Sequence, residues 1–471
     1  MTTDSNDDIR SGWKGRFVAA GDPGFDDAVH SRVFNRRRPT DRLPVAVLQA
    51  ADVDDVVRGV RLAHERGWSV TTRAGGHSWI VWSVQNDALL VDLAAFAAID
   101  YDDVTGIVSA GPAVRGGSDL DPVLAAHGRF FNGGHCPTVG IGGFLLQGGM
   151  GWNCRGWGWA TESVVAVDVV TASGEVLRCD AEQNSDLYWA ARGAGPAFPG
   201  VVVTFHLQTR PRYTALTSSM QIYPAAVAPE VLAWMHETRW DLDDSVELVM
   251  VNLDAATLPF LDYEGPVLVV DGLSFAPTAE EGRAALAPLE TSPYLGQAMF
   301  HVTAAPADME ELRERQTNAN PENHFYVSEG AYLVGGTAEL ISAITPAFTT
   351  LPTTKSFAIW FDMGRAPQRA LPDMALSLQS DIYFAAYLVG EDDADVRAAT
   401  SWITDRIAEL EPVKSGTYLG DSDLISRPAK FMSDEAYARL NKIRECRDPA
   451  GIFPTYLHAP DVPINQNPWE V

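Results

Sequence analysis

The chain has 471 residues, of which 46% are hydrophobic and 21% charged, and its formal net charge is −27. This length predicts two domains or three. An acidic surface repels phosphate backbones and anionic lipids, which argues against nucleic-acid and membrane partners. The N-terminus lacks the apolar stretch of a signal peptide, no run reaches the roughly 18 apolar residues of a membrane span, and four cysteines form no CxxC pair. A cytoplasmic protein with reduced thiols is the simplest expectation.

The first half of the chain alternates between predicted helices and strands. Residues 1–40 are interpreted as an N-terminal extension, and residues 41–212 as the first domain. Asp52 is placed to cap a helix with apolar residues at helical spacing, which Gly67 ends. Strands are predicted over 68–73, 88–93 and 164–171, and a tight turn at 173–174 leads the last of these into residues 176–177.

The second half changes character. Within residues 213–410, long apolar strands are predicted over 246–254 and 266–275, a helix after Thr278, and an amphipathic helix over 393–410. Residues 411–471 form a C-terminal segment with a helix after Ser433. The pattern predicts an α+β protein whose second domain is an antiparallel sheet backed by helices.

Several common site motifs are absent. There is no Gly-Lys dipeptide for a phosphate loop, no complete GxGxxG, no HExxH and no GxSxG. The usual kinase, Rossmann, zinc-protease and serine-hydrolase chemistries therefore lose their support, and no metal site is predicted.

Two glycine-rich patches carry the remaining signal. Residues 133–158 contain 10 of the chain's 39 glycines, and segment 73–78 reads RAGGHS. Glycine lets the backbone approach a ligand closely and adopt positive φ. His77 and Cys136 sit in these patches, and both side chains are nucleophiles when deprotonated. A hydrogen-bonding surface histidine and a buried filler cysteine are the alternatives.

The patches resemble the covalent-flavin motifs of the berberine-bridge-enzyme-like branch of the vanillyl-alcohol-oxidase superfamily. Segment 73–78 matches R-x-x-G-G-H-S, and segment 134–143 matches G-x-C-x-x-V-G-x-x-G. The similarity covers about 230 residues, through 148–151, 167–170, 186–189, 192–195 and 200–203, and returns at 439–443 and 448–449. The family's Y-x-N-Y pattern appears here as Tyr418-Leu-Gly420-Asp421.

The resemblance implies a two-lobed PCMH-type FAD-binding domain, completed by the C-terminal segment, and a substrate domain over the flavin. It implies bicovalent FAD, with His77 on the 8α-methyl carbon and Cys136 on C6. Gly148 and Gly149 would allow tight packing beneath the cofactor, and Val201 and Val203 would lie near the adenine. The full set of predicted cofactor residues beside the two anchors is Arg73, Gly75, Gly76, Ser78, Thr138, Val139, Gly140, Gly142, Gly143, Gly148, Gly149, Val201 and Val203.

The implied chemistry is hydride transfer from an alcohol, a sugar hydroxyl, an amine or a specialised metabolite to the flavin. Candidates for the catalytic base are His135, Asp362, Tyr383 and Tyr418, and candidates for the pocket walls are Trp79, Trp360 and Phe384. For the base candidates and for Trp360 and Phe384, a structural role is the alternative.

The electron acceptor is predicted from Val139. With a small residue at that position, the chain resembles the oxygen-reactive members of the family, which favours an oxidase that makes H2O2. The alternatives are a dehydrogenase with a non-oxygen acceptor and, from another class, a non-catalytic acidic binding protein on the same fold.

Overall fold

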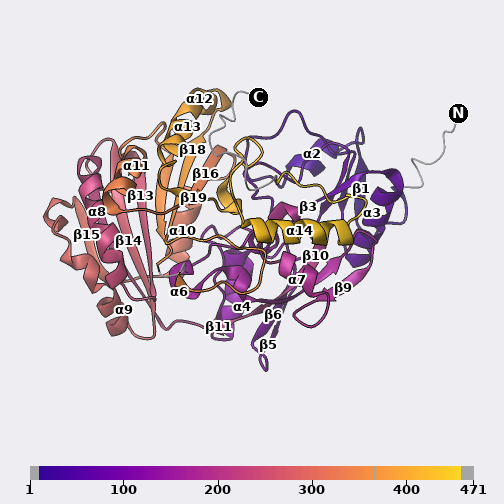
Figure 1. The fold of residues 1–471 in the computed structure, drawn as a ribbon, viewed down its shortest axis with the longest axis horizontal. Coiled ribbons are helices and arrows are strands. Elements are labelled where there is room, and N and C mark those ends of the chain that lie inside the picture. The colour runs from indigo at the N-terminus through magenta and orange to yellow at the C-terminus, as the bar shows by residue number, and fades with distance from the viewer. Residues whose placement is uncertain (1–9, 365–367, 458–471) are drawn as a thin grey trace.

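The computed structural model describes residues 10–364 and 368–457, and its elements form two lobes that lie side by side (Figure 1). Strands up to Pro211 belong to the first lobe, and strands from Ala215 onward form an eight-stranded sheet in the second. The α+β class is therefore confirmed. No helix in these two ranges is both long and apolar enough to cross a membrane.

Four strands build the first sheet, in the order β1 (Arg16–Ala19), β2 (Ala46–Gln49), β4 (Ala88–Asp92) and β3 (Ser69–Arg73). β2 and β3 run parallel to β4, whereas β1 runs antiparallel to β2. The predicted helix is α3 (Val53–Arg66), in which Asp52 caps the Asp55 N–H and Gly67 ends the helix at φ 66°. β1 and α2 (Phe25–His30) also pack here, so the predicted N-terminal extension contributes to this lobe.

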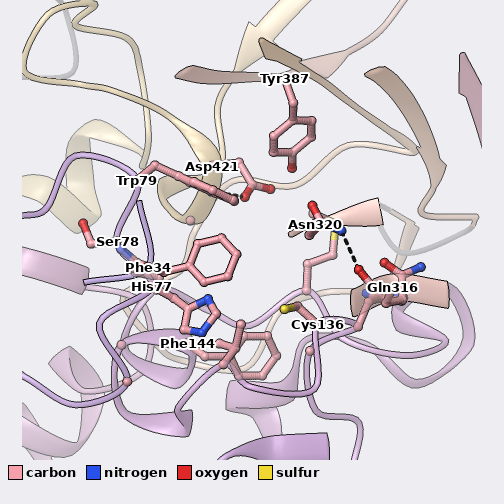
Figure 2. A pocket seen from close by; sticks show the side chains of 18 of the residues that line it. Phe34, His77, Ser78, Trp79, Cys136, Phe144, Gln316, Asn320, Tyr387 and Asp421 are labelled. Atoms are coloured by element: carbon pink, nitrogen blue, oxygen red, sulfur yellow. Dashed lines mark hydrogen bonds between the residues drawn. The ribbon is translucent and has the colours of Figure 1, made fainter. Parts of the chain in front are cut away.

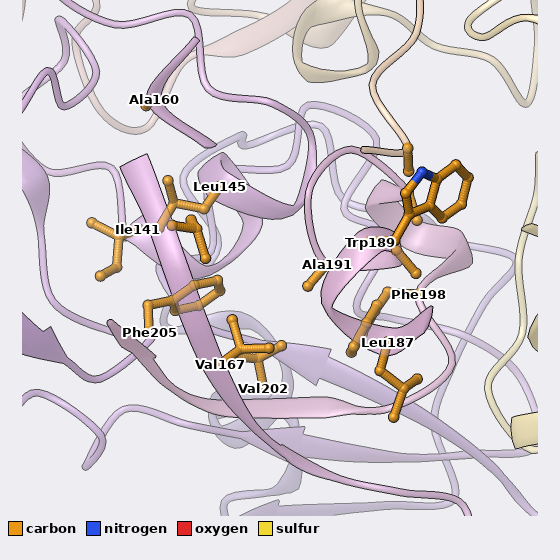
Figure 3. Close-up of a cluster of buried hydrophobic side chains, with 14 of the residues drawn as sticks. Ile141, Leu145, Ala160, Val167, Leu187, Trp189, Ala191, Phe198, Val202 and Phe205 are labelled. Carbon is orange, nitrogen blue, oxygen red and sulfur yellow. The ribbon is translucent and has the colours of Figure 1, made fainter. Parts of the chain in front are cut away.

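The second sheet is antiparallel, in the order β5 (Ile99–Asp102), β6 (Ile107–Ala110), β10 (Val201–Gln208), β8 (Val164–Val170) and β9 (Val176–Cys179). One face packs against α5 (Ile141–Leu146) and α7 (Ser185–Ala190), and Figure 3 shows Val167, Val202 and Phe205 in this core. The short elements of this lobe are α4 (Asp121–Ala126), β7 (Arg129–Phe130), α6 (Cys154–Trp157) and β11 (Arg210–Pro211).

The second lobe is an antiparallel sheet, as predicted. Its order is β15 (Phe300–Pro306), β12 (Ala215–Pro224), β14 (Pro266–Ala276), β13 (Val246–Asp254), β17 (Phe357–Asp362), β18 (Ile382–Gly390), β16 (Phe325–Leu333) and β19 (Lys414–Gly416). Five helices pack against it: α8 (Ala228–Thr238), α9 (Ala279–Leu286), α11 (Thr337–Thr349), α12 (Asp393–Ala398) and α13 (Thr400–Glu409). α10 (Met309–Ala319) lies between the sheet and the first lobe (Figure 1).

One helix prediction is wrong in part. The segment 393–410 is not continuous but breaks at Ala399, which ends α12 and precedes α13. The Thr400 hydroxyl bonds back to the Val396 carbonyl at 2.9 Å, a side-chain contact that competes with regular helix geometry.

The C-terminal segment returns to the first lobe. α14 (Asp434–Arg447) begins after its Ser433 cap, and Arg447 pairs with Asp186 of α7 at 2.7 Å. Leu440 and Ile443 of α14 are buried in the first lobe's core. Figure 1 shows this helix along the first lobe, although β19, which precedes it, pairs with β16 of the second.

Candidate active site

A cavity of about 810 Å³ lies between the two lobes, and both lobes line it. This volume is within the range of small-molecule and cofactor sites. The loop after β3 and the segment 134–140 form one side, and the inner face of the eight-stranded sheet forms the opposite side. Figure 2 shows His77 and Cys136 on one side of the open space, with Trp79, Tyr387 and Asp421 across from them.

The loop after β3 is held by a buried ion pair. Arg73 is 2% exposed, and its guanidinium donates to Asp92 Oδ2 at 2.6 Å and to the Ala28 carbonyl at 2.6 Å. Asp92 also pairs with Arg32. Because these bonds occupy the Arg73 side chain, its role here is to position the loop.

Two glycines let the loop turn toward the cavity. Gly76 has φ +81°, and a Cβ on it would lie 1.7 Å from the Arg32 carbonyl oxygen. A Cβ on Gly75 would lie 2.6 Å from the Gly140 nitrogen, so the two motif segments touch through their backbones. Glycine is required at both positions because neither leaves room for a side chain.

His77 is presented as a neutral imidazole. Its ring stacks on Phe34, with centroids 4.4 Å apart, and its Nε2 lies 3.1 Å from the Thr138 hydroxyl. Burial lowers the pKa of His77 to about 4, because the charged form is poorly solvated there. At neutral pH the ring therefore keeps a free electron pair for attack on an electrophile.

Cys136 lies next to the same hydroxyl. Its Sγ is 3.6 Å from Thr138 Oγ1, and burial is the main cause that raises the pKa of the thiol. Thr138 thus contacts both predicted anchors, and it brings the distant patches together at one point of the cavity.

The other predicted cofactor residues divide into two groups. Those that line the cavity are Arg73, Gly75, Gly76, Ser78, Val139, Gly140 and Gly143. Those outside its lining are Thr138, Gly142, Gly148, Gly149, Val201 and Val203. A Cβ added to Gly142 or to Gly149 would lie 2.8 Å from a neighbouring side-chain atom, as expected of glycines that allow close packing. The side chains of Val201 and Val203 are buried in a hydrophobic core of the first lobe.

A polar cluster faces the predicted anchors across the cavity. Asp421 Oδ1 accepts from Trp79 Nε1 at 3.1 Å, and its Oδ2 accepts from the Tyr383 hydroxyl at 2.9 Å. Burial raises the pKa of Asp421, although the Trp79, Tyr383 and Tyr387 hydrogen bonds oppose this. Asp421 is not among the base candidates predicted from the sequence, although it occupies the last position of the altered Y-x-N-Y pattern.

Two base candidates reach the cavity. Tyr418 lines it, and its hydroxyl accepts from the Met150 N–H at 3.3 Å. His135 also lines it and donates from Nε2 to Glu247 at 3.1 Å. Glu247 itself lines the cavity and accepts a further bond from the Asn153 N–H, and it is a second carboxylate that the sequence did not predict there.

Three predictions are wrong because of strand alternation. Asp362, Trp360 and Phe384 do not line the cavity. Asp362 is fully buried and pairs with Arg155 at 2.9 Å, while Trp360 and Phe384 belong to the core beneath the helices. Their neighbour Phe361 faces the cavity instead, since successive side chains of a strand point to opposite faces. Tyr383 is also outside the lining and contributes through Asp421.

The cavity suits a flavin. The site has two nucleophilic side chains on one side, apolar and aromatic surface for a flat ring, and glycine backbone where a large group must come close. His77, Cys136 and the segments 75–78 and 139–143 would hold FAD, which supplies a hydride acceptor.

Comparisons with known proteins agree with this site. A family model described as an FAD binding domain matches residues 44–180. FAD-linked oxidoreductase nodO of Hypoxylon pulicicidum is 36% identical over 422 residues, which cover 89% of this chain and 92% of that protein. The structure of 6-hydroxy-D-nicotine oxidase from Arthrobacter nicotinovorans has a TM-score of 0.80 at 20% identity, and the match covers 96% of this chain and 98% of that one.

A third similar protein, Phl p 4, matches both as wild type and as a variant. Wild-type Phl p 4.0202, described as a glucose dehydrogenase, has a TM-score of 0.77 at 16% identity, over 93% of this chain and 95% of that one. An isoleucine-to-valine variant of Phl p 4, described as a glucose oxidase, has a TM-score of 0.76 at 17% identity and the same coverage.

The fold and the site define an FAD-dependent oxidoreductase. The chain belongs to the FAD-linked oxidoreductases, and its FAD binding domain covers residues 44–180. This membership sets aside the alternative of a non-catalytic binding protein.

Proposed function

We propose that the protein is an oxidase that carries FAD on two covalent links, to His77 and Cys136, and that transfers electrons from a small-molecule substrate to O2. The observation that carries this proposal is that both nucleophiles line one cavity and contact the same residue, Thr138. FAD supplies the hydride acceptor when bound, and O2 takes up two electrons and two protons to give H2O2.

Asp421 is the proton acceptor in this proposal. Oxidation of an alcohol or amine removes a hydride from carbon and a proton from oxygen or nitrogen, and the proton needs a base. Asp421 lines the cavity, and Trp79 and Tyr383 hold its two oxygens in place. Because burial raises the pKa of Asp421, its carboxylate is a stronger base than an exposed aspartate.

Val139 supports oxygen as the acceptor. It lines the cavity three residues after Cys136, at the position that the resemblance associates with oxygen reactivity. The two forms of Phl p 4 offer a parallel, since the isoleucine-to-valine variant is the one described as an oxidase. The competing proposal is a dehydrogenase with a quinone or protein acceptor.

Oxygen uptake during turnover separates the two proposals. The native enzyme should consume O2 and release H2O2 in equal amounts with a substrate that bleaches its flavin absorbance. Val139→Ile should slow reoxidation of the reduced flavin by O2 at least tenfold, because the added methyl group narrows the path of O2 to the flavin. It should leave the rate of anaerobic bleaching by substrate unchanged. Rapid dye reduction without O2 uptake by the native enzyme would establish the dehydrogenase instead.

A further inference from the structure

The inner face of the eight-stranded sheet presents aligned apolar side chains to the cavity. Ile222 of β12 pairs with Val269 of β14, Val269 with Val251 of β13, and Val251 with Ile359 of β17. These four side chains form one continuous row across four strands, and all of them line the cavity. The neighbouring positions on this face extend the row; together we call them the apolar wall: Met220, Ile222, Val249, Val251, Leu253, Val269, Leu273, Phe357, Ile359 and Phe361.

The apolar wall is not needed to pack the helices. The opposite face of the same strands already forms the core beneath the helices, through residues such as Met250, Leu268 and Trp360. Ile222 and Val269 also pack with Leu258, Leu261 and Phe300 at one end of the wall. The apolar side chains that line the cavity beyond this cluster form a surface for an apolar ligand. Phe260, which is 58% exposed, and Leu258 also line the cavity, so its apolar lining reaches the protein surface.

One polar group interrupts the wall. Asp271 of β14 lies between Met220 and Val249 in the strand register. Its Oδ1 is buried and has no hydrogen-bond partner among the described residues, and its Oδ2 lies 3.6 Å from Arg315 Nη2. A buried acceptor without a partner favours a ligand that brings one.

We propose that the substrate is a bulky, mostly apolar molecule that packs its hydrocarbon body on the apolar wall and directs one hydroxyl or N–H group at Asp271. This inference rests on the proposed oxidase function and narrows its substrate class. A carbohydrate is disfavoured, because the apolar wall has no hydrogen-bond partners for the many hydroxyl groups of a sugar.

Binding tests the inference without turnover. Flavin absorbance changes and quenching of cavity tryptophan fluorescence would be titrated anaerobically with two polycyclic alcohols, testosterone and sclareol, and with glucose and cellobiose. We expect the polycyclic alcohols to bind at least 100-fold more tightly than the sugars. Tighter binding of either sugar, or no binding of either alcohol, would overturn the proposal.

Matched variants locate the ligand. Val251→Thr keeps the side-chain shape but places a hydroxyl in the middle of the apolar wall, and it should weaken binding of the polycyclic alcohols about tenfold. Val176→Thr on β9, at a site that is 52% exposed, is the control and should change nothing. Asp271→Leu should weaken binding of the alcohols by a similar factor, because a side chain of similar size without any acceptor replaces the buried carboxylate. Unchanged affinity in both cavity variants, at normal flavin content, would place the ligand elsewhere.

The outcome also distinguishes this inference from the proposed oxidase function. If the enzyme oxidises a sugar with O2 uptake and does not bind the polycyclic alcohols, the proposal of an apolar substrate is rejected and the proposed oxidase function stands. If the enzyme binds the alcohols tightly but never reacts with O2, the oxidase function is rejected and the apolar substrate class stands.

Discussion

At the scale of single residues, the most specific proposal is that Asp421 is the catalytic base. The carboxylate is the active form of a base, and burial raises the pKa of Asp421 above the usual 3.8. Substrate-dependent bleaching of the flavin should therefore speed up as pH rises through that higher pKa. Asp421→Asn should slow bleaching by about 10²–10⁴-fold and abolish this pH dependence. Anaerobic stopped-flow absorbance over a pH series measures both effects.

A nearby aspartate provides the control. Asp423 is buried two residues further on but does not line the cavity, and it caps the Ser426 N–H. Asp423→Asn should keep both the rate of bleaching and its pH dependence. If Asp421→Asn behaved in the same way, the base would be another group, with Tyr418 the next to test.

The two proposed anchors come from sequence motifs, whereas their surroundings could not be predicted from the sequence. His77 and Cys136 lie in motifs with strict spacing, so residue type and order identify them. Phe34, which stacks on His77, comes from a segment without any motif, and Glu247 reaches His135 from a strand more than 100 residues away. Contacts of this kind join segments that are far apart in the sequence, within one lobe or between the two, and no local pattern encodes them.

At the scale of elements, the sequence pattern predicts where strands and helices lie but not always which of their faces lines the site. β17 has the sequence FAIWFD, and its side chains are buried or half-buried on both faces of the sheet. The sequence therefore does not indicate which of them face the cavity. Without polar alternation the pattern predicts a strand but not the direction of its faces. This is why Trp360 and Asp362 were assigned to the site when Phe357, Ile359 and Phe361 occupy it. In contrast, the cap residues Asp52, Thr278 and Ser433 predicted three helix starts correctly.

The loop after β3 allows a test of an element. Gly76→Ala places a Cβ against the Arg32 carbonyl and forces an alanine to adopt φ +81°. It should lower the free energy of unfolding by about 3 kcal/mol or more and reduce flavin incorporation. Gly67→Ala is the matched control, because it also has positive φ (+66°) but meets no atom within 4 Å. It should cost only about 1–2 kcal/mol and leave the flavin content normal.

Urea denaturation and the ratio of flavin to protein absorbance measure the two effects. Equal losses of stability in the two variants would mean that the Arg32 contact relaxes and that backbone strain alone matters. Full flavin incorporation in Gly76→Ala would contradict a role for this loop in holding the cofactor.

At the scale of the whole molecule, the site lies between two lobes that are built from different parts of the chain. The first lobe, which consists of the strands up to Pro211 and α14, contains the two glycine-rich patches. The eight-stranded sheet of the second lobe presents its apolar wall across the cavity. The general architecture followed from the order of predicted elements. The packing of β1 and α2 on the first sheet did not, since four- and six-residue elements carry too little periodicity to be recognised.

The central claim is that one FAD is bound to this chain through both His77 and Cys136. Acid precipitation of the purified protein, followed by absorbance and intact-mass measurement of the pellet, tests it most directly. The yellow colour and the mass of one FAD should remain with the native chain and with each single variant, His77→Ala and Cys136→Ala. The double variant should release all of its FAD, and complete release from the native chain would contradict both links.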